Sequence, residues 1–332
     1  MNKSKIKGLI FGCAIGDALG MPIESFSKEK IQSKYKRLTN YIQPVDHKWF
    51  NGKESGTTTD DTSLLTATVE SIIDSNGLDM DSQVKWHIKA IEKSDEGMGD
   101  TTRIALRSLS NDKHWSNSGL FNNGKGVGNG VAMKVSPIAA YFSVCENSNS
   151  LPKILSFIVD YNNMTHKTKI SLIGAVSIFS VAVDCLLSTK KLNINHLINN
   201  CLNCFEILKD KNSSSEEKDD LTLRLKEMFD NYNNWSKDDI INKYNGGYCY
   251  VYDSVPFALS FFLKNPYSIE SLYDVINSGG DTDTNGAIVG SLLGSLNGIE
   301  IFPEHLINGL KDKDYLNDLS ERFYYKLIDF KD

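Results

Sequence analysis

Proline is scarce in this sequence, and long runs that alternate apolar with polar residues are absent. Only 7 of the 332 residues are proline. A half-buried β-strand requires alternation with a period of two, whereas the apolar residues here recur mostly at helical spacing. The sequence therefore predicts an all-α protein. Its 40% apolar content is enough for a sizeable core, and we expect a single domain over residues 1–332.

The chain also lacks an excess of basic residues. Its 36 Lys and Arg against 42 Asp and Glu give a formal net charge of −6. This balance argues against direct nucleic-acid binding and against binding to anionic membranes, because both need a basic surface. An acidic protein can still bind an anionic nucleotide through metal ions and backbone amides.

The six cysteines show neither a disulfide framework nor a zinc motif. Cys201 and Cys204 form a close pair, but no second CxxC or histidine pair accompanies them. Their spacing places both thiols on one face of a helix, so we expect a structural role. Reduced thiols fit a cytoplasmic protein best.

No targeting segment and no membrane association are expected. Residues 1–19 superficially resemble a signal peptide, but glycines interrupt the apolar stretch and Asp17 lies where a cleavage region should be neutral. The apolar run 170–187 contains three serines and Asp184. This composition favours a buried core helix over a transmembrane helix.

Helical spacing extends along most of the chain, and two of the helical segments carry a glycine at every fourth position. Such glycines lie on one helix face and allow a second backbone to approach closely, at a cost of about 1 kcal/mol each relative to alanine. They are Gly8, Gly12, Gly16, Gly20, Gly286, Gly290 and Gly294. We expect helices at residues 6–20, 61–75, 81–93, 101–109, 130–143, 152–161, 167–187, 194–208, 218–231, 253–263, 268–277, 284–297, 303–310 and 315–328.

The segment 57–65 combines two adjacent aspartates, Asp60 and Asp61, with several hydroxyl side chains. A threonine or aspartate here can cap the helix that follows, which explains one acidic residue but not two. Adjacent carboxylates repel each other unless a cation compensates their charge, and hard divalent cations prefer such oxygen ligands. The cluster is compatible with a helix cap and with a metal site.

The segment 278–286, with the sequence SGGDTDTNG, is more specific. It matches the start of an EF-hand loop from Asp281, but the bidentate glutamate that the loop needs is replaced by Leu292. The DxDxT motif of phosphatases that form an aspartyl-phosphate follows an apolar strand, whereas a polar turn precedes Asp281. We therefore disfavour both interpretations. If the two acidic clusters meet, their four carboxylates and two hydroxyls can hold two cations about 3.5–4 Å apart.

A third segment, 12–24, has the sequence GCAIGDALGMPIE. Followed in order by TTDDT at 58–62 and SGGDTDT at 278–284, it resembles the ADP-ribosylglycohydrolase family, which includes dinitrogenase-reductase-activating glycohydrolase and the enzymes that reverse arginine and serine ADP-ribosylation. Segments 97–106, 128–137 and 164–166 also match. The resemblance implies a compact, orthogonal multi-helix fold with a binuclear metal site.

The resemblance also implies roles for individual residues. Two divalent cations, Mg²⁺ or Mn²⁺, would be held by Thr59, Asp60, Asp61, Asp281, Asp283 and Thr284. The set contains no cysteine or histidine, which disfavours Zn²⁺. Glu24 matches a mobile carboxylate near the scissile bond. The catalytic acid or base would be Glu24, Asp60, Asp61 or Asp281, and the sequence leaves this choice open.

A substrate site is implied by the same resemblance. Backbone amides in glycine-rich turns would receive the diphosphate and ribose, because a backbone without Cβ can approach a phosphate closely. Either Tyr248 or Tyr250 would stack on adenine, or both would be ordinary core aromatics. His166 would lie near the ligand or serve as a structural histidine. Asp100 departs from the family pattern: it would pair with a guanidinium leaving group or cap a helix. The candidate residues are Gly97, Gly99, Asp100, Gly128, Asn129, Gly130, His166, Tyr248 and Tyr250.

The expected activity is metal-dependent hydrolysis, by a monomer, of the glycosidic bond that joins ADP-ribose to an arginine or serine side chain or to a related conjugate. Two alternatives stay open. One is another metal-dependent hydrolase of nucleotide-like substrates on the same scaffold. The other is a catalytically silent ADP-ribose-binding or structural protein, which the presence of all the metal positions disfavours.

Overall fold

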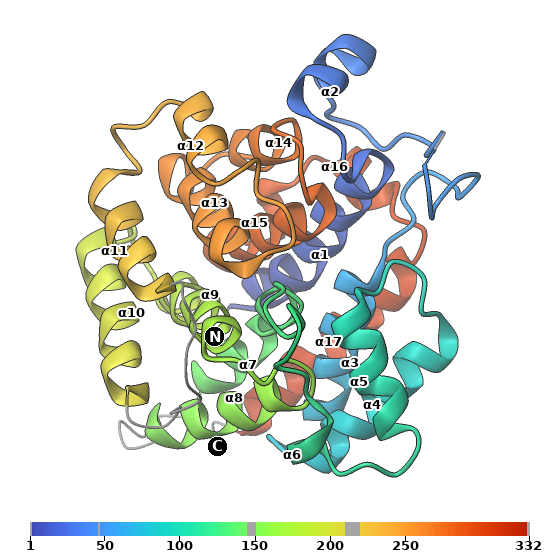
Figure 1. Ribbon diagram of the computed structural model, residues 1–332, viewed down its shortest axis with the longest axis vertical. Helices are drawn as coiled ribbons and strands as arrows, with labels where there is room; N and C mark the ends of the chain where they lie inside the picture. The colour runs from blue at the N-terminus through green and yellow to red at the C-terminus, as the bar shows by residue number, and fades with distance from the viewer. Residues whose placement is uncertain (1, 46, 145–150, 210–219, 331–332) are drawn as a thin grey trace.

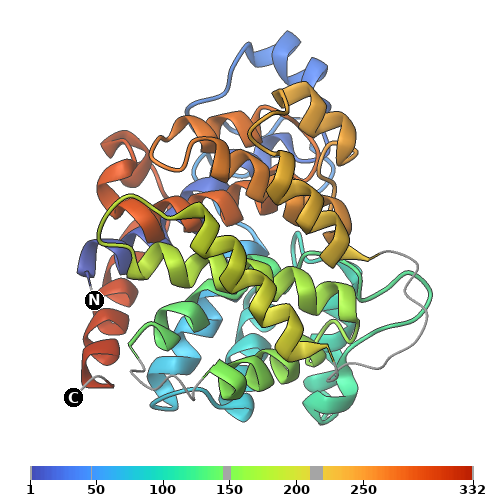
Figure 2. The same ribbon diagram turned by 90° about the vertical axis from the view of Figure 1, so that its left-hand side faces the viewer.

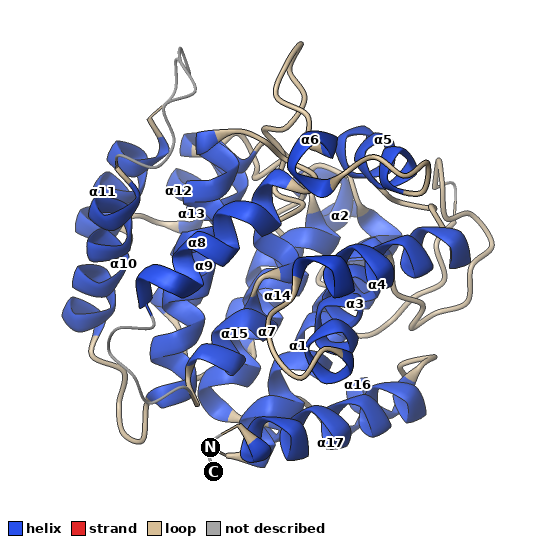
Figure 3. Ribbon diagram, turned by 90° about the horizontal axis from the view of Figure 1, so that it is seen from below, coloured by secondary structure: helices blue, strands red, loops and turns tan. Residues whose placement is uncertain are grey.

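The computed structural model describes residues 2–45, 47–144, 151–209 and 220–330, and its ribbon consists of helices joined by loops (Figures 1 and 3). Within these ranges, β pairing is limited to isolated bridges between single residues. The all-α prediction is therefore confirmed.

The helices follow one another along the chain, with the longest described connections before α3 and before η2. They are α1 (Lys3–Gly20), η1 (Met21–Ile23), α2 (Lys28–Tyr35), α3 (Asp60–Asp74), α4 (Met80–Lys93), α5 (Asp100–Leu109), α6 (Trp115–Ser118), η2 (Ala132–Lys134), α7 (Ser136–Phe142), α8 (Leu151–Asn163), α9 (Lys169–Leu187), α10 (Ile194–Leu208), α11 (Leu221–Asn231), α12 (Lys237–Lys243), α13 (Val251–Lys264), α14 (Glu270–Ile276), α15 (Thr282–Asn297), η4 (Ile299–Ile301), α16 (Glu304–Asn308) and α17 (Lys313–Asp329).

Most predicted segments coincide with helices, but the prediction of one continuous helix over 130–143 is wrong. The chain forms a 3₁₀ turn at Ala132–Lys134 and then begins α7 at Ser136. Pro137 explains the break, since it has no amide hydrogen to donate and fits only the first turn of a helix. The short helices α2, α6 and α12 were not predicted. Residues 218 and 219 of the predicted segment 218–231 lie outside the described residues.

The centre of the fold is the antiparallel pair α1 and α15, which pack against each other more extensively than any other two described elements (Figure 1). A Cβ on Gly12 would lie 2.1 Å from the carbonyl oxygen of Gly290, and one on Gly16 would lie 1.9 Å from that of Gly286. Both distances are far inside van der Waals contact. The two backbones therefore touch directly: the close approach that the glycine spacing predicted for each face is between the two glycine-faced helices themselves.

The other helices surround this pair in two groups. Helices α9, α13 and α14 pack on α15, whereas α3 packs on α1, α4 and α17. Figure 1 shows α9 to α11 on one side of the molecule and α3 to α5 on the other, and Figure 2 shows α17 beside the start of α1. Because α1 and α15 are antiparallel, the C-terminal end of α1 lies beside the N-terminal end of α15.

Two helices, α1 with η1 (Lys3–Ile23) and α9 (Lys169–Leu187), are long and apolar enough to span a membrane by length and composition. Of their most apolar windows, 94% and 83% are buried inside the structure. That burial is the property of core helices in a folded protein, which agrees with the interpretation of residues 170–187 made from the sequence.

Candidate active site

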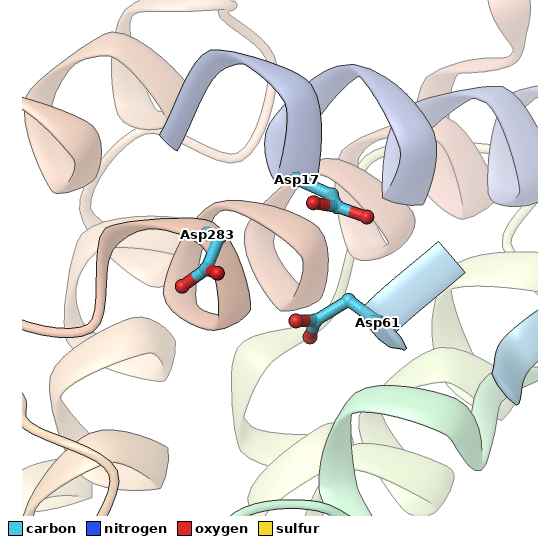
Figure 4. Close-up of side chains that lie close together, drawn as sticks. All are labelled: Asp17, Asp61 and Asp283. Carbon is cyan, nitrogen blue, oxygen red and sulfur yellow. The ribbon is translucent and has the colours of Figure 1, made fainter. Parts of the chain in front are cut away.

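Three aspartates from three different helices converge near the C-terminal end of α1. Carboxylate oxygens of Asp17 on α1, Asp61 on α3 and Asp283 on α15 all lie within 4.8 Å of one another (Figure 4). A second group with the same spacing consists of Glu24, Asp281 and Asp283. The two acidic clusters of the sequence therefore meet in the fold, and Asp283 belongs to both groups.

Asp17 connects α1 to the first turn of α3. Its carboxylate accepts hydrogen bonds from the backbone amides of Thr59, at 2.9 and 3.0 Å, and Thr62, at 3.1 Å. It also accepts one from the Thr62 hydroxyl at 2.6 Å. We did not predict Asp17 as a site residue. The sequence did contain a sign of its role: Asp17 lies within an otherwise apolar helix with a glycine face, where an unpaired charge would be costly.

The site is rich in buried carboxylates. Burial, reinforced by neighbouring carboxylates, raises the pKa of Asp60 to about 7 and raises the pKa values of Asp61 and Asp283 well above the ordinary value. The hydroxyls of Thr59 and Thr284 donate to Asp61 Oδ2 at 3.3 and 3.2 Å. Asp61 Oδ1 is buried without a hydrogen-bond partner. This arrangement is what a bound cation would stabilise.

Glu24 is the most accessible member of the two groups, with its side chain 20% exposed. It follows η1, and a hydrogen bond of 2.8 Å from the Ser25 amide to the Gly280 carbonyl places it beside the second acidic cluster. Burial, followed by the charges of Asp281 and Asp60, raises the pKa of Glu24 to about 8.

A cleft of about 790 Å³ opens above the acidic groups. Its floor and walls include most of the residues singled out from the sequence: Glu24, Asp60, Asp61, Gly97, Gly99, Asp100, Gly128, Asn129, Gly130, His166, Tyr250, Asp281, Asp283 and Thr284. Thr59 does not line this cleft, although its hydroxyl reaches Asp61 from behind. Tyr248 also lies outside the lining, and it is 47% exposed.

The glycine-rich loop 126–130 is held over the metal-ligand candidates by two kinds of contact. Gly128 pairs with Tyr250 in an isolated bridge, and the Asn129 amide donates to the Cys249 carbonyl at 3.0 Å. The Asn129 side chain donates to Asp281 Oδ2 at 2.7 Å. Asn129 therefore links the cleft wall to the acidic floor.

Several cationic and aromatic residues of the cleft were not predicted. Lys48, Trp49, Arg103 and Lys125 line it. Asp100, for which the sequence suggested a guanidinium partner or a cap, forms ion pairs with Arg103 and, at 3.8 Å, with Lys125. The available signal was the presence of basic residues next to glycine-rich turns, which is typical of sites for anionic ligands.

His166 and Lys134 are buried close to the floor. Burial and the nearby Lys134 charge lower the pKa of His166 to about 3, and its Nδ1 atom lies 2.9 Å from the Thr165 hydroxyl. Burial lowers the pKa of Lys134 to about 7, although the negative charge of Asp60 acts to raise it. His166 is therefore neutral near pH 7, so it can accept or donate one hydrogen bond through Nε2.

Comparison with known proteins identifies the architecture. A sequence model described as ADP-ribosylglycohydrolase matches residues 2–329. The chain belongs to the ADP-ribosylglycohydrolase family. It is 23% identical to human ADP-ribosylhydrolase ARH3, over 97% of this chain and 94% of the human protein. It is also 23% identical to the ADP-ribosyl-[dinitrogen reductase] glycohydrolase of Rhodospirillum rubrum, over 92% and 90% of the two chains.

Two further similarities cover nearly the whole chain. An uncharacterized protein of Archaeoglobus fulgidus is 27% identical over 97% of this chain and 96% of its own. The solved structure of an ADP-ribosylglycohydrolase-related protein complex superposes with a TM-score of 0.67 at 20% identity, covering 98% of each chain. At that identity, the structural likeness establishes the fold alone. Membership of the ADP-ribosylglycohydrolase family supports a glycosidic-bond hydrolase in general terms.

Proposed function

We propose that this ADP-ribosylglycohydrolase cleaves the N- or O-glycosidic bond at C1″ of the distal ribose in ADP-ribose conjugated to an arginine or serine side chain, or in a related conjugate. The proposal rests on two clusters of acidic residues that have Asp283 in common. They lie at the floor of a cleft whose walls are glycine-rich loops. Floor and walls suit different parts of one ligand: a hydroxyl-bearing sugar below and an anionic diphosphate along the loops.

The donor set fits two divalent cations such as Mg²⁺ or Mn²⁺. All ligand candidates are oxygen donors, Asp61 Oδ1 is buried without a partner, and burial together with the neighbouring carboxylates raises the pKa values of Asp61 and Asp283. Hard cations prefer such sites. Thr59, Asp60, Asp61, Asp281, Asp283 and Thr284 would hold them, and the buried Asp17 would fix the segment that carries the first three. The bound cations would polarise the ribose hydroxyls and a water molecule.

The remaining chemistry is assigned to side chains that reach the cleft. Glu24 lines the cleft and is the most accessible carboxylate of the two acidic groups, so it is the one placed to exchange a proton with the leaving group or with water. The buried carboxylates of the floor face the sugar, where they stabilise the positive charge of an oxocarbenium-like transition state. The backbone amides around Gly97 and Gly128 have no Cβ to obstruct a phosphate.

One assay panel tests this proposal. Purified protein would be incubated with ADP-ribosyl-arginine peptide, ADP-ribosyl-serine peptide and poly(ADP-ribose), each with Mg²⁺, with Mn²⁺ and with EDTA. We expect release of ADP-ribose from one of these substrates, with loss of release in EDTA and recovery on adding cation. Binding of ADP-ribose by calorimetry without turnover of any conjugate would instead indicate a silent binding protein, and EDTA-insensitive turnover would contradict the metal-dependent scheme.

A further inference from the structure

A second cavity of about 330 Å³ lies on the other side of the segment that carries Asp60. One wall is the face of α3 that presents Ala67 and Glu70, and the opposite wall is the face of α4 that presents Trp86, Lys89 and Lys93. Asp60 lines both this cavity and the cleft described above. The volume is at the lower end of the range of about 300–1,000 Å³ that is typical of small-molecule sites.

Apolar and aromatic side chains contribute part of the cavity lining. Phe50, Trp86, Ala90 and Leu316 contribute apolar lining. Two of these side chains, Phe50 and Trp86, are aromatic. This part of the lining therefore suits a small molecule with a planar apolar body.

Most of the acidic groups around the cavity are already paired. Arg322 donates two hydrogen bonds, of 2.7 and 2.9 Å, to the carboxylate of Glu70. Glu96 pairs with Lys53 at 2.5 Å. Asp312 is exposed at the start of α17, and Asp60 belongs to the acidic site on the far side of the wall.

Two ammonium groups are left without a carboxylate partner. Among the described residues, neither Lys89 nor Lys93 lies within salt-bridge distance of a carboxylate, although the charge of Lys89 also acts on Asp74, the partner of Lys85. The Nζ atom of Lys89 lies 4.0 Å from the centre of the Trp86 ring, so it sits directly beside the aromatic surface. Because Lys89 and Lys93 lie one helical turn apart on α4, both can reach the same anionic group.

We propose that this cavity is a binding site for a small organic anion with a planar apolar body, of the aromatic carboxylate class. The planar body would lie on the Trp86 side between α3 and α4, and its carboxylate would meet Lys89 and Lys93 at the rim. The ligand would contact the chain segment Thr57–Asp60 from behind, on the side opposite the glycosidic-bond site. The proposal is independent of the hydrolytic activity.

The tryptophans allow the binding position to be read directly. The chain contains four tryptophans; Trp86 lines the second cavity, and Trp49 lines the cleft. Protein labelled with 5-fluorotryptophan would be titrated with 1-naphthoate and followed by ¹⁹F NMR, with resonances assigned from Trp86→Phe and Trp49→Phe. We expect a saturable shift of the Trp86 resonance. The neutral isostere 1-naphthamide should bind at least about tenfold more weakly, because it lacks the charge-assisted contact.

Variants of the rim and of the interior complete the test. Lys89→Met and Lys93→Met should each weaken naphthoate binding several-fold, while Lys226→Met on the exposed face of α11 should not. Ala90→Phe, which fills the cavity, should abolish the Trp86 shift in a protein whose helical circular dichroism is retained. The proposal is overturned by the absence of a saturable Trp86 shift, by a shift confined to Trp49, or by equal affinity for naphthoate and naphthamide.

Discussion

Asp17 Oδ2 accepts hydrogen bonds from both the backbone amide and the hydroxyl of Thr62, at 3.1 and 2.6 Å. With the two contacts from the Thr59 amide, this carboxylate adds to the cap that the Thr59 side chain gives α3, although it comes from another helix. Asp17 on α1 thus holds in place the first turn of α3, which carries Asp60 and Asp61.

Replacing Asp17 by alanine should therefore weaken metal binding as well as folding. We expect Asp17→Ala to lose about 1–3 kcal/mol of unfolding free energy and to raise the Kd for Mn²⁺ at least several-fold. Calorimetry and thermal denaturation measure the two effects. Asp79→Ala is the matched control, because Asp79 caps α4 through the Ser82 amide at 2.7 Å and is remote from the acidic groups. It should lower stability by about 1 kcal/mol with unchanged Mn²⁺ affinity.

The contact between α1 and α15 gives a second prediction. Gly16→Ala would place a Cβ 1.9 Å from the Gly286 carbonyl oxygen, so the helices must separate, at a cost of about 2 kcal/mol or more. Gly99→Ala is the control, since nothing lies within 4 Å of the corresponding Cβ. Differential scanning calorimetry should show a large fall in Tm for Gly16→Ala and little change for Gly99→Ala. An unchanged Tm for Gly16→Ala would contradict direct backbone contact.

These glycines also show how far the sequence alone could predict the fold. Spacing of four residues placed Gly8 to Gly20 on one helix face and Gly286 to Gly294 on another, but it did not say that the two faces meet. The helix boundaries were predictable from apolar periodicity and capping residues, such as Thr59 before Asp60. The short helix Lys28–Tyr35 was missed because it buries a single residue, Ile31, and so lacks an apolar stripe.

The candidate site, like the fold, was only partly predictable from the sequence. The acidic clusters and glycine-rich turns were identifiable because their residue types are unusual for their local structure. Lys48 and Trp49 line the cleft because of the path that the loop between α2 and α3 takes. A sequence gives no local sign of such a path. The difference between Tyr248 and Tyr250, two residues apart, likewise depends on which way the segment between α12 and α13 turns.

Asp283 should be essential for turnover and costly for the metal-free fold. It belongs to both carboxylate groups, so we expect Asp283→Asn to reduce kcat by at least about 100-fold. The same change removes a buried charge whose pKa is raised well above normal by burial and by Glu24 and Asp281. Thermal denaturation in EDTA at pH 8 should therefore show Asp283→Asn to be more stable than the parent protein. Full activity of the variant would rule out the two-cation proposal.

The pH dependence of stability should reveal the same charges in the metal-free protein. Folding raises the pKa values of Asp60, to about 7, and Glu24, to about 8, so the folded state binds more protons than the unfolded state between their ordinary values and pH 8. These carboxylates therefore make a contribution to stability in EDTA that decreases as pH rises through this range. Buried groups with lowered pKa values act in the opposite sense: His87 and His166 up to about pH 7.5, and Lys134, whose pKa is lowered to about 7, above pH 7.

Lys134→Met removes the opposing lysine, so the stability of this variant between about pH 7 and 8 reports mainly on the carboxylates. Urea denaturation of this variant in EDTA should show unfolding free energy decreasing with pH across this window, and saturating Mg²⁺ or Mn²⁺ should remove the decrease. A flat profile in EDTA would mean that the acidic groups are neutralised without added cation.

The two tyrosines near the cleft should differ in their effect on substrate binding. Tyr250 lines the cleft and pairs through its backbone with Gly128, whereas Tyr248 lies outside the lining and is 47% exposed. If adenine stacks on an aromatic ring of this segment, Tyr250→Ala should raise KM for the cleaved conjugate about tenfold, because stacking on one base contributes about 1–3 kcal/mol, with a smaller change in kcat. Tyr248→Ala, the matched control two residues away, should leave both constants within about twofold. The reverse pattern in steady-state kinetics would assign the adenine contact to Tyr248 and would require the segment 246–250 to turn toward the ligand on binding.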